Sequence, residues 1–153
     1  MQKYARIINK KTGLVEVGLG LNAEFYESIG MTLMLVQQSD IDGNWYLADK
    51  CPMKTDEQKK YEEKERIGNL KLTGADVERG IYQVIGMDFD DIFVHISELK
   101  PEGVDLKALK IELKANHFYR GNPYVDIVGE LLGFTKTQLD NFFETNDPQC
   151  LKK

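Results

Sequence analysis

The stretch Asn122–Glu144, NPYVDIVGELLGFTKTQLDNFFE, decides how the second half of the chain folds. Asn122 is a helix-capping residue, and Pro123 fits the first helical position, where no backbone donor is needed. Val125, Val128 and Leu132 then recur at the spacing of one helix face. The stretch therefore opens with a short amphipathic helix.

A glycine turn and a second helix follow in the same stretch. Gly133 stands where a helix ends in a left-handed conformation, and Thr135 or Thr137 caps the next helix. The apolar face of this second helix is supplied by Leu139, Phe142 and Phe143. We expect the resulting hairpin to close a small helical domain.

The helical pattern extends back to residue 67. Thr73 and Asp76 form a capping signature before one helix, Asp88 opens the next, and Leu106, Leu109 and Leu113 line a third that we expect to run to Phe118 or Tyr119. With the hairpin, this predicts an all-helical C-terminal domain of about five short helices over 67–147. The polar residues 148–153 predict a flexible tail.

The first 53 residues have a different periodicity. Alternation over 3–9, 14–19, 31–37 and 45–48 predicts strands, and Asn22 caps a short helix that ends at Gly30. Phe25, Tyr26 and Ile29 are expected to pack down on the first hairpin. The result is a ββαββ module, small enough to need a partner surface for full stability.

Residues 54–66, KTDEQKKYEEKER, join the two parts and carry almost no apolar side chain. Such a segment is typical of a solvated helix held by ion pairs along its surface. We interpret 54–66 as a charged helical linker. The fold class is therefore α+β.

Composition limits the function classes. The 153 residues are 42% hydrophobic and 29% charged, with a net charge of −5, which argues against general affinity for nucleic acids. No apolar run is long enough to cross a membrane, and no signal peptide opens the chain, so we expect a cytoplasmic protein. Cys51 and Cys150 are interpreted as free thiols.

No motif for catalysis, metal binding or cofactor binding is present. His95 and His117 stand in no cluster of metal-ligand residues, and no serine occupies a nucleophile elbow. Gly18-Leu19-Gly20 lacks the remaining residues of a phosphate loop. Asp40, Asp42 and Asn44 have the wrong spacing for a calcium loop and predict a hairpin turn.

The hairpin also has the spacing of a helix-turn-helix motif, with small Gly129 before Gly133 and Leu139 after it. Its charges oppose DNA binding. Asn122–Glu144 holds four carboxylates against Lys136 alone, and a recognition helix must approach phosphates. We expect no binding of duplex DNA.

Aromatic residues and an arginine gather where we expect the third helix to end. Aromatic and arginine side chains are favoured at the centres of protein interfaces. The alternative is that Phe118 and Tyr124 are core residues and that Arg120 pairs with an acid. The candidate partner-binding residues are Phe118, Tyr119, Arg120 and Tyr124, followed by Trp45 and Tyr46 on the edge of the first module.

Two pieces of the chain resemble small bacteriophage and prophage proteins of the tail-fibre or tail-assembly region. The first is YARIINKKTGLVEVGLG with AEFYESIGM and GNWYL; the second is FYRGNPYVDIVGELLGFTKTQLDNFF. The resemblance implies a viral origin and a structural role, and it carries no active-site residues. Phages also use such modules in proteins that disarm host defences.

These observations predict a non-enzymatic phage protein that binds another protein, in the assembly of tails or tail fibres. A second hypothesis is an inhibitor of a host defence complex such as a CRISPR effector, since residues 67–147 carry a net charge of −6. A third is a helix-turn-helix regulator. The partner is a tail component or a defence complex, and both a homo-oligomer and association with the virion remain open.

Overall fold

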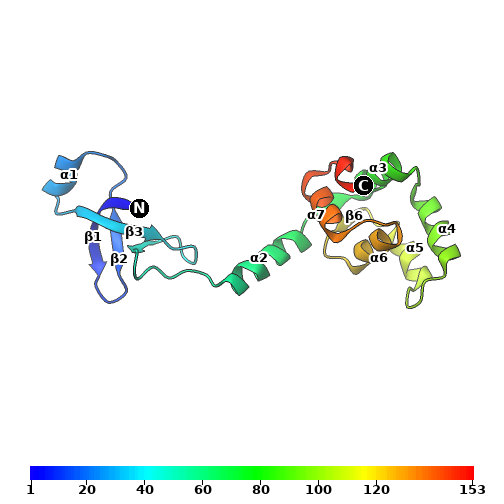
Figure 1. The fold of residues 1–153 in the computed structure, drawn as a ribbon, viewed down its shortest axis with the longest axis horizontal. Helices are drawn as coiled ribbons and strands as arrows, with labels where there is room; N and C mark the ends of the chain where they lie inside the picture. The colour runs from blue at the N-terminus through cyan, green and yellow to red at the C-terminus, as the bar shows by residue number, and fades with distance from the viewer. The chain divides into compact units, whose positions relative to one another are not determined.

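A computed structural model describes all residues from 1 to 153 and has an α+β fold. The chain divides into two compact units, an N-terminal unit Met1–Lys59 and a C-terminal unit Lys60–Lys153 (Figure 1). Its elements are β1 (Gln2–Asn9), β2 (Leu14–Val17), α1 (Ala23–Ser28), β3 (Thr32–Gln38), β4 (Trp45–Leu47), α2 (Asp56–Gly68), β5 (Lys71–Thr73), α3 (Gly74–Ile85), α4 (Phe89–Leu99), α5 (Leu106–Glu112), β6 (His117–Tyr119), α6 (Pro123–Leu131), α7 (Lys136–Thr145) and the 3-10 turn η1 (Pro148–Leu151).

The four strands of the N-terminal unit close into a small barrel in the order β1-β2-β4-β3, with every pair antiparallel. The sequence pattern predicted the four strands but not their closure into a barrel. Because β4 pairs with β2 on one side and with β3 on the other, Trp45 and Tyr46 lie on a strand without a free edge. Pairing between β2 and β4 joins residues about thirty positions apart, which a local pattern does not reveal.

The barrel has a small core. Ala5, Val15 and Val36 are buried, and the partly buried side chains around them include Ile7 and Val17. These residues alternate with exposed ones along their strands, as expected for strands with one covered face. A core of this size stabilises a unit of 59 residues only marginally.

Helix α1 begins at its predicted cap, where the Asn22 side chain accepts a hydrogen bond from the Phe25 N–H. The expectation that its three apolar residues all pack on the hairpin is wrong. Phe25 is 53% exposed and Ile29 43% exposed, whereas Tyr26 stacks on Tyr4 with ring centroids 5.8 Å apart. Because α1 has only six residues, a single side chain, Tyr26, packs against β1.

Helix α2 corresponds to the charged helix that was predicted over 54–66. It has no buried residue. Its polar surface explains this exposure, because none of its faces is apolar enough to pack. Arg66, in its last turn, forms ion pairs with Glu63 at 2.8 Å and with Glu144 at 2.9 Å.

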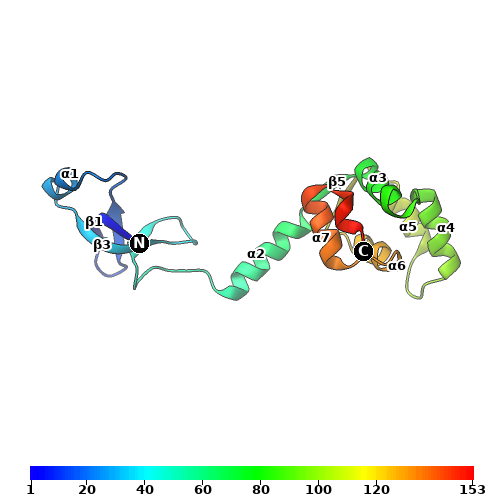
Figure 2. The same ribbon diagram turned by 45° about the horizontal axis from the view of Figure 1, so that its top comes forward.

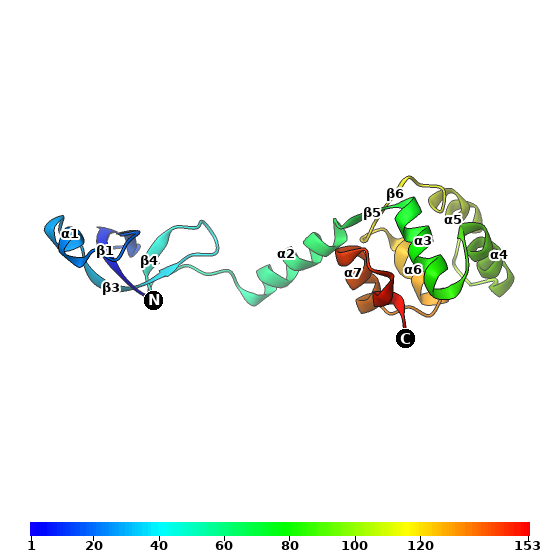
Figure 3. The ribbon, with the colours of Figure 1, turned by 90° about the horizontal axis from the view of Figure 1, so that it is seen from above.

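Helices α3–α7 surround the core of the C-terminal unit, and Figures 2 and 3 show α3, α6 and α7 grouped together there. The predicted caps are confirmed: the side chains of Thr73 and Asp88 accept the expected backbone hydrogen bonds, and Thr135 forms a capping box. Leu139 and Phe142 are buried, as a core-filling hairpin requires.

The third predicted helix is too long, and the C-terminal unit is not all helical. Helix α5 ends at Glu112, and residues 117–119 form β6, which pairs antiparallel with β5. The pairing continues beyond the strands, where the N–H of Arg120 donates to the carbonyl of Leu70 at 2.8 Å. Phe118 therefore enters the core from a strand, opposite Leu72.

The end of the chain is not a flexible polar tail. Residues 148–151 form η1, and Leu151 is 1% exposed within the core of the C-terminal unit. The Gln138 side chain in α7 donates a hydrogen bond to the carbonyl of Lys152 at 3.1 Å. This hydrogen bond ties the residue that follows η1 to α7. One buried leucine in a polar sequence is too weak a pattern to predict this contact.

Candidate protein-binding surface

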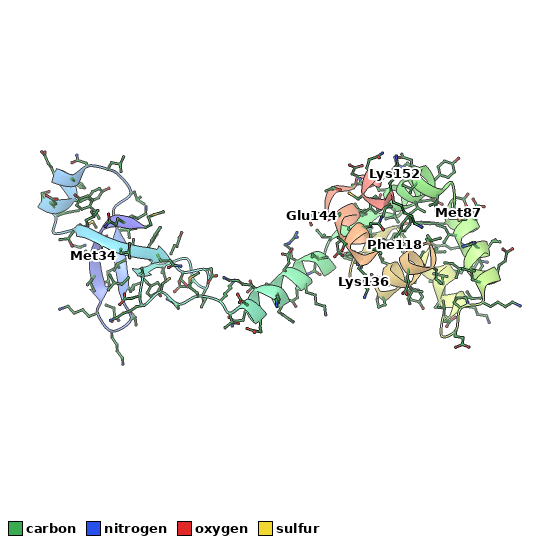
Figure 4. The ribbon with its side chains drawn as sticks, viewed as in Figure 1. Met34, Met87, Phe118, Lys136, Glu144 and Lys152 are labelled. Atoms are coloured by element: carbon green, nitrogen blue, oxygen red, sulfur yellow. The ribbon has the colours of Figure 1, made fainter.

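The predicted partner patch does not form one exposed surface. Phe118 is 6% exposed and packs edge-on against Phe89, with ring centroids 5.6 Å apart. Arg120 is also 6% exposed, Tyr124 is half-buried, and Tyr119 alone is largely exposed, at 52%. The expectation that Arg120 is available to a partner is therefore wrong, and the alternative of a paired, buried arginine is confirmed. Figure 4 labels Phe118 among the elements of the C-terminal unit.

Arg120 links the segment after β6 to helices α6 and α7. Its Nε donates to Asp140 at 2.6 Å, and its Nη1 lies 2.9 Å from Asp126. Asp126 Oδ1 nevertheless lacks an aligned hydrogen bond, so Asp140 is the stronger partner. The sequence signal for this arrangement was one arginine, Arg120, just before a hairpin rich in carboxylates.

Trp45 and Tyr46 are half-buried in β4. The Lys3 ammonium lies 4.9 Å from the centroid of the Trp45 ring. The Tyr46 hydroxyl donates to Asp42 at 2.8 Å, and this hydrogen bond raises the pKa of Tyr46. Both side chains thus have internal roles in the barrel and its β3–β4 turn.

A contiguous group of exposed apolar side chains lies elsewhere on the barrel. Leu33 and Leu35, 54% and 59% exposed, point outward from β3, opposite Tyr4 and Gln2 of β1. The other members lie beside the start of β1 and in the loop after β2. We name this surface the leucine face and define it by Met1, Leu19, Leu21, Leu33 and Leu35.

The loop that carries Leu19 and Leu21 is held in place by Tyr26. The Gly20 N–H donates to the Tyr26 hydroxyl at 2.8 Å, and a Cβ on Gly18 would lie 2.5 Å from the Tyr26 ring. Glycine at position 18 is therefore needed for the ring to approach. The consequence is an ordered loop that presents Leu19 at 94% and Leu21 at 100% exposure.

A hollow of about 240 Å³ lies within this surface. Its lining comes from the start of β1, the loop after β2 and Leu33 of β3. Tyr4 on its wall stacks with Tyr26 and donates to Glu27 at 3.2 Å, and partial desolvation together with this contact raises the pKa of Tyr4. The leucine face therefore combines projecting side chains with a depression.

The leucine face was not among the predicted site residues, although a signal for it was present. The run MTLMLV at 31–36 is apolar on both faces of its strand, and only one of them faces the barrel core. A strand covered on one side alternates with polar residues, so a two-sided apolar strand indicates a second covered face. Large exposed apolar patches mark interaction sites on soluble proteins.

The remaining features offer little chemistry. No group of three or more histidine, cysteine, aspartate or glutamate residues is placed to hold a metal ion. A cavity of about 50 Å³ in the C-terminal unit is lined almost entirely by apolar core residues. None of the helices combines the length and the apolar character that crossing a membrane requires.

The leucine face is thus the strongest candidate for a functional surface, on the exposure of its side chains and on its shape. Comparisons of the chain with protein-family models, curated protein sequences and solved structures find no match.

Proposed function

We propose that this chain is a non-enzymatic protein-binding protein and that the leucine face is its contact surface. The ββαββ module, closed into a barrel, is the binding module in this proposal. The observation that carries it is the exposure of five large apolar side chains on one face of a unit whose core cluster has three buried residues. Burial of apolar surface is the main favourable term in protein association.

The biological setting that we propose is the assembly of phage tails or tail fibres. The support is the resemblance of residues 4–20 and 118–143 to small phage and prophage proteins of the tail region. In this setting the protein acts in the host cytoplasm as an assembly factor or becomes a minor part of the virion. Cosedimentation of the protein with purified tail particles separates the two roles.

A second candidate is an inhibitor that binds a host defence complex. It is favoured by the acidic balance of residues 67–147, whose net charge of −6 is suited to a basic nucleic-acid channel. This candidate predicts capture of a purified CRISPR effector and weaker capture at high salt. The tail-assembly candidate predicts neither.

The direct test is site-specific crosslinking in phage-infected cells. A photoreactive phenylalanine analogue replaces Leu33 on the leucine face, and a matched control carries it at exposed Glu57 in α2. We expect crosslinked protein products from position 33 and none above background from position 57. Equal crosslinking from the two positions overturns the assignment of the leucine face.

A DNA shift assay completes the discrimination. The four carboxylates of Asn122–Glu144 should prevent binding of α7 to duplex DNA at physiological salt. Reproducible shifts at micromolar protein that weaken with added salt would favour the regulator hypothesis instead.

A further inference from the structure

We propose that the leucine face binds the same face of a second copy of this chain, so that the protein forms a symmetric homodimer through its barrel. The inference rests on the proposed function in one respect, which is that the leucine face is a protein-binding surface. It adds the identity of the partner.

The first argument is area. From their exposed fractions, the five side chains present roughly 600 Å² of accessible surface, close to the ~800 Å² per partner of a standard interface. The largest apolar patch on a typical monomer is about 300–600 Å², so this surface lies at the upper limit for a protein that stays alone. A twofold contact covers the same patch on both copies at once.

The second argument is shape. A twofold interface must be self-complementary, so each copy must supply both a projection and a depression. The loop held by Tyr26 projects Leu19 and Leu21, and the same loop forms one wall of the hollow of about 240 Å³, which Leu33 also lines. The leucines of one copy can therefore enter the hollow of the other while its own hollow is filled in return.

The third argument is charge. None of the five defining side chains is charged; the charged groups that line the hollow are the α-ammonium of Met1 and the ammonium of Lys3, which lies over the Trp45 ring. Glu27, beside the hollow, is already a hydrogen-bond acceptor for Tyr4. The apolar side chains of this face thus bring no charge against their copies, whereas the Met1 ammonium must stay at the solvated rim of a symmetric contact, since like charges in opposition would disfavour it.

The test is the mass of the purified full chain in solution, measured by sedimentation and light scattering over a range of concentrations. We expect the wild type to reach twice the chain mass of 17.5 kDa. Leu33→Glu should weaken dimerisation at least tenfold. Ile41→Glu is the matched control, because Ile41 is similarly exposed, at 55%, in the β3–β4 turn outside the leucine face. This control should dimerise like the wild type.

A second measurement avoids substitution by a charged residue, which can affect folding. A photoreactive analogue at position 35 is placed in a mixture of isotopically light and heavy chains, and mixed-mass crosslinks between copies are expected. Wild type that stays at one chain mass at all concentrations overturns the inference, as do equal effects of Leu33→Glu and Ile41→Glu.

The two proposals can fail separately. If the purified chain is monomeric while position 33 crosslinks to a different protein in infected cells, the homodimer is wrong and the proposed function stands. If the chain neither dimerises nor crosslinks through the leucine face, both are wrong.

Discussion

Arg120 joins two helices of the C-terminal unit through two carboxylates. Removing a buried partner from such a set leaves the remaining charges uncompensated, at a cost of about 3–5 kcal/mol in fully buried cases. Here Asp126 and Asp140 keep about a third of their side-chain surface in water, at 38% and 34%, which reduces the effect. We therefore expect Arg120→Ala to lower the free energy of unfolding by roughly 2–4 kcal/mol.

Urea denaturation measures this change, and two comparisons sharpen it. Arg79→Ala breaks an exposed pair with Asp76 and should change the free energy of unfolding by less than about 1 kcal/mol. Asp140→Asn should destabilise more than Asp126→Asn, because only Asp140 has an aligned hydrogen bond to Arg120. Equal stabilities for Arg120→Ala and Arg79→Ala would contradict the structural role.

Asp40 connects the β3–β4 turn to the segment that follows the barrel. A hydrogen bond from the Lys54 N–H at 2.8 Å, with a smaller contribution from Lys59, lowers the pKa of Asp40. A carboxyl group with a lowered folded-state pKa stabilises the fold above its ordinary pKa of about 4, and this contribution is lost as the pH falls through the folded value.

We expect an NMR titration of the Asp40 carboxyl carbon to give a midpoint below that of an unstructured aspartate. Lys59→Met should raise this midpoint only in part, because the backbone donor of Lys54 remains. A midpoint at the ordinary value would show that the Lys54 hydrogen bond is absent in solution.

Helices α3 and α7 approach each other at Gly80. A Cβ at this position would lie 2.5 Å from Cζ of Phe142, whose rigid ring is 1% exposed. In a helix interior, Gly→Ala is normally favourable by about 1 kcal/mol. Here we expect Gly80→Ala to destabilise the C-terminal unit by about 1–3 kcal/mol, because the ring must shift within a packed core.

Thermal unfolding measures the sign of this change. Gly68→Ala at the end of α2 is the control, because its Cβ would have only ordinary contact, 3.8 Å from Gly121 Cα. It should be neutral or slightly stabilising. A Gly80→Ala variant that melts at or above the wild-type temperature would mean that α3 and α7 do not pack this closely.

Elements with local signals were predictable, and elements made by distant pairing were not. Thr73, Asp88 and Thr135 begin helices as their sequences indicate, because a cap depends on three or four neighbouring residues. Strand β6 was missed because its partner β5 lies more than forty residues earlier, and the leucines of α5 were extrapolated across it. Barrel closure was missed for the same reason.

The candidate surface could not be predicted for the same reason, because it depends on contacts between residues far apart in the sequence. Composition identified Phe118 and Arg120 as interface-like, but burial depends on tertiary contacts, and the structure turns both inward. Leu33 and Leu35 occur in an apolar run that was sufficient to predict a strand. Only the register with β1 reveals that they face outward.

At the scale of the whole molecule, the two units differ in how much core they have. The C-terminal unit has thirteen buried hydrophobic residues in one cluster, whereas the barrel cluster has three. Stability rises with the apolar area that a unit buries, so the barrel is the less stable unit by itself. Dimerisation through the leucine face would make the melting temperature of the barrel rise with protein concentration.

Limited proteolysis should separate the two units. Helix α2 has no buried residue, so its amide groups are exposed to local opening and cleavage. Trypsin sites at Lys54, Lys59 and Lys60 precede the last turn, whereas Arg66 is bound to Glu63 and Glu144 of the C-terminal unit. We expect the earliest cut at Lys60 and slower cutting at Lys59 and Arg66, whose side chains are held in ion pairs with Asp40 and with Glu63 and Glu144. The released C-terminal fragment should retain cooperative unfolding, because its core cluster lies entirely within it.

Mass spectrometry of the digest identifies the cuts, and circular dichroism of the fragment measures its melting. Cutting that begins within α3–α7, or a released fragment without a melting transition, would show that the C-terminal unit does not fold by itself.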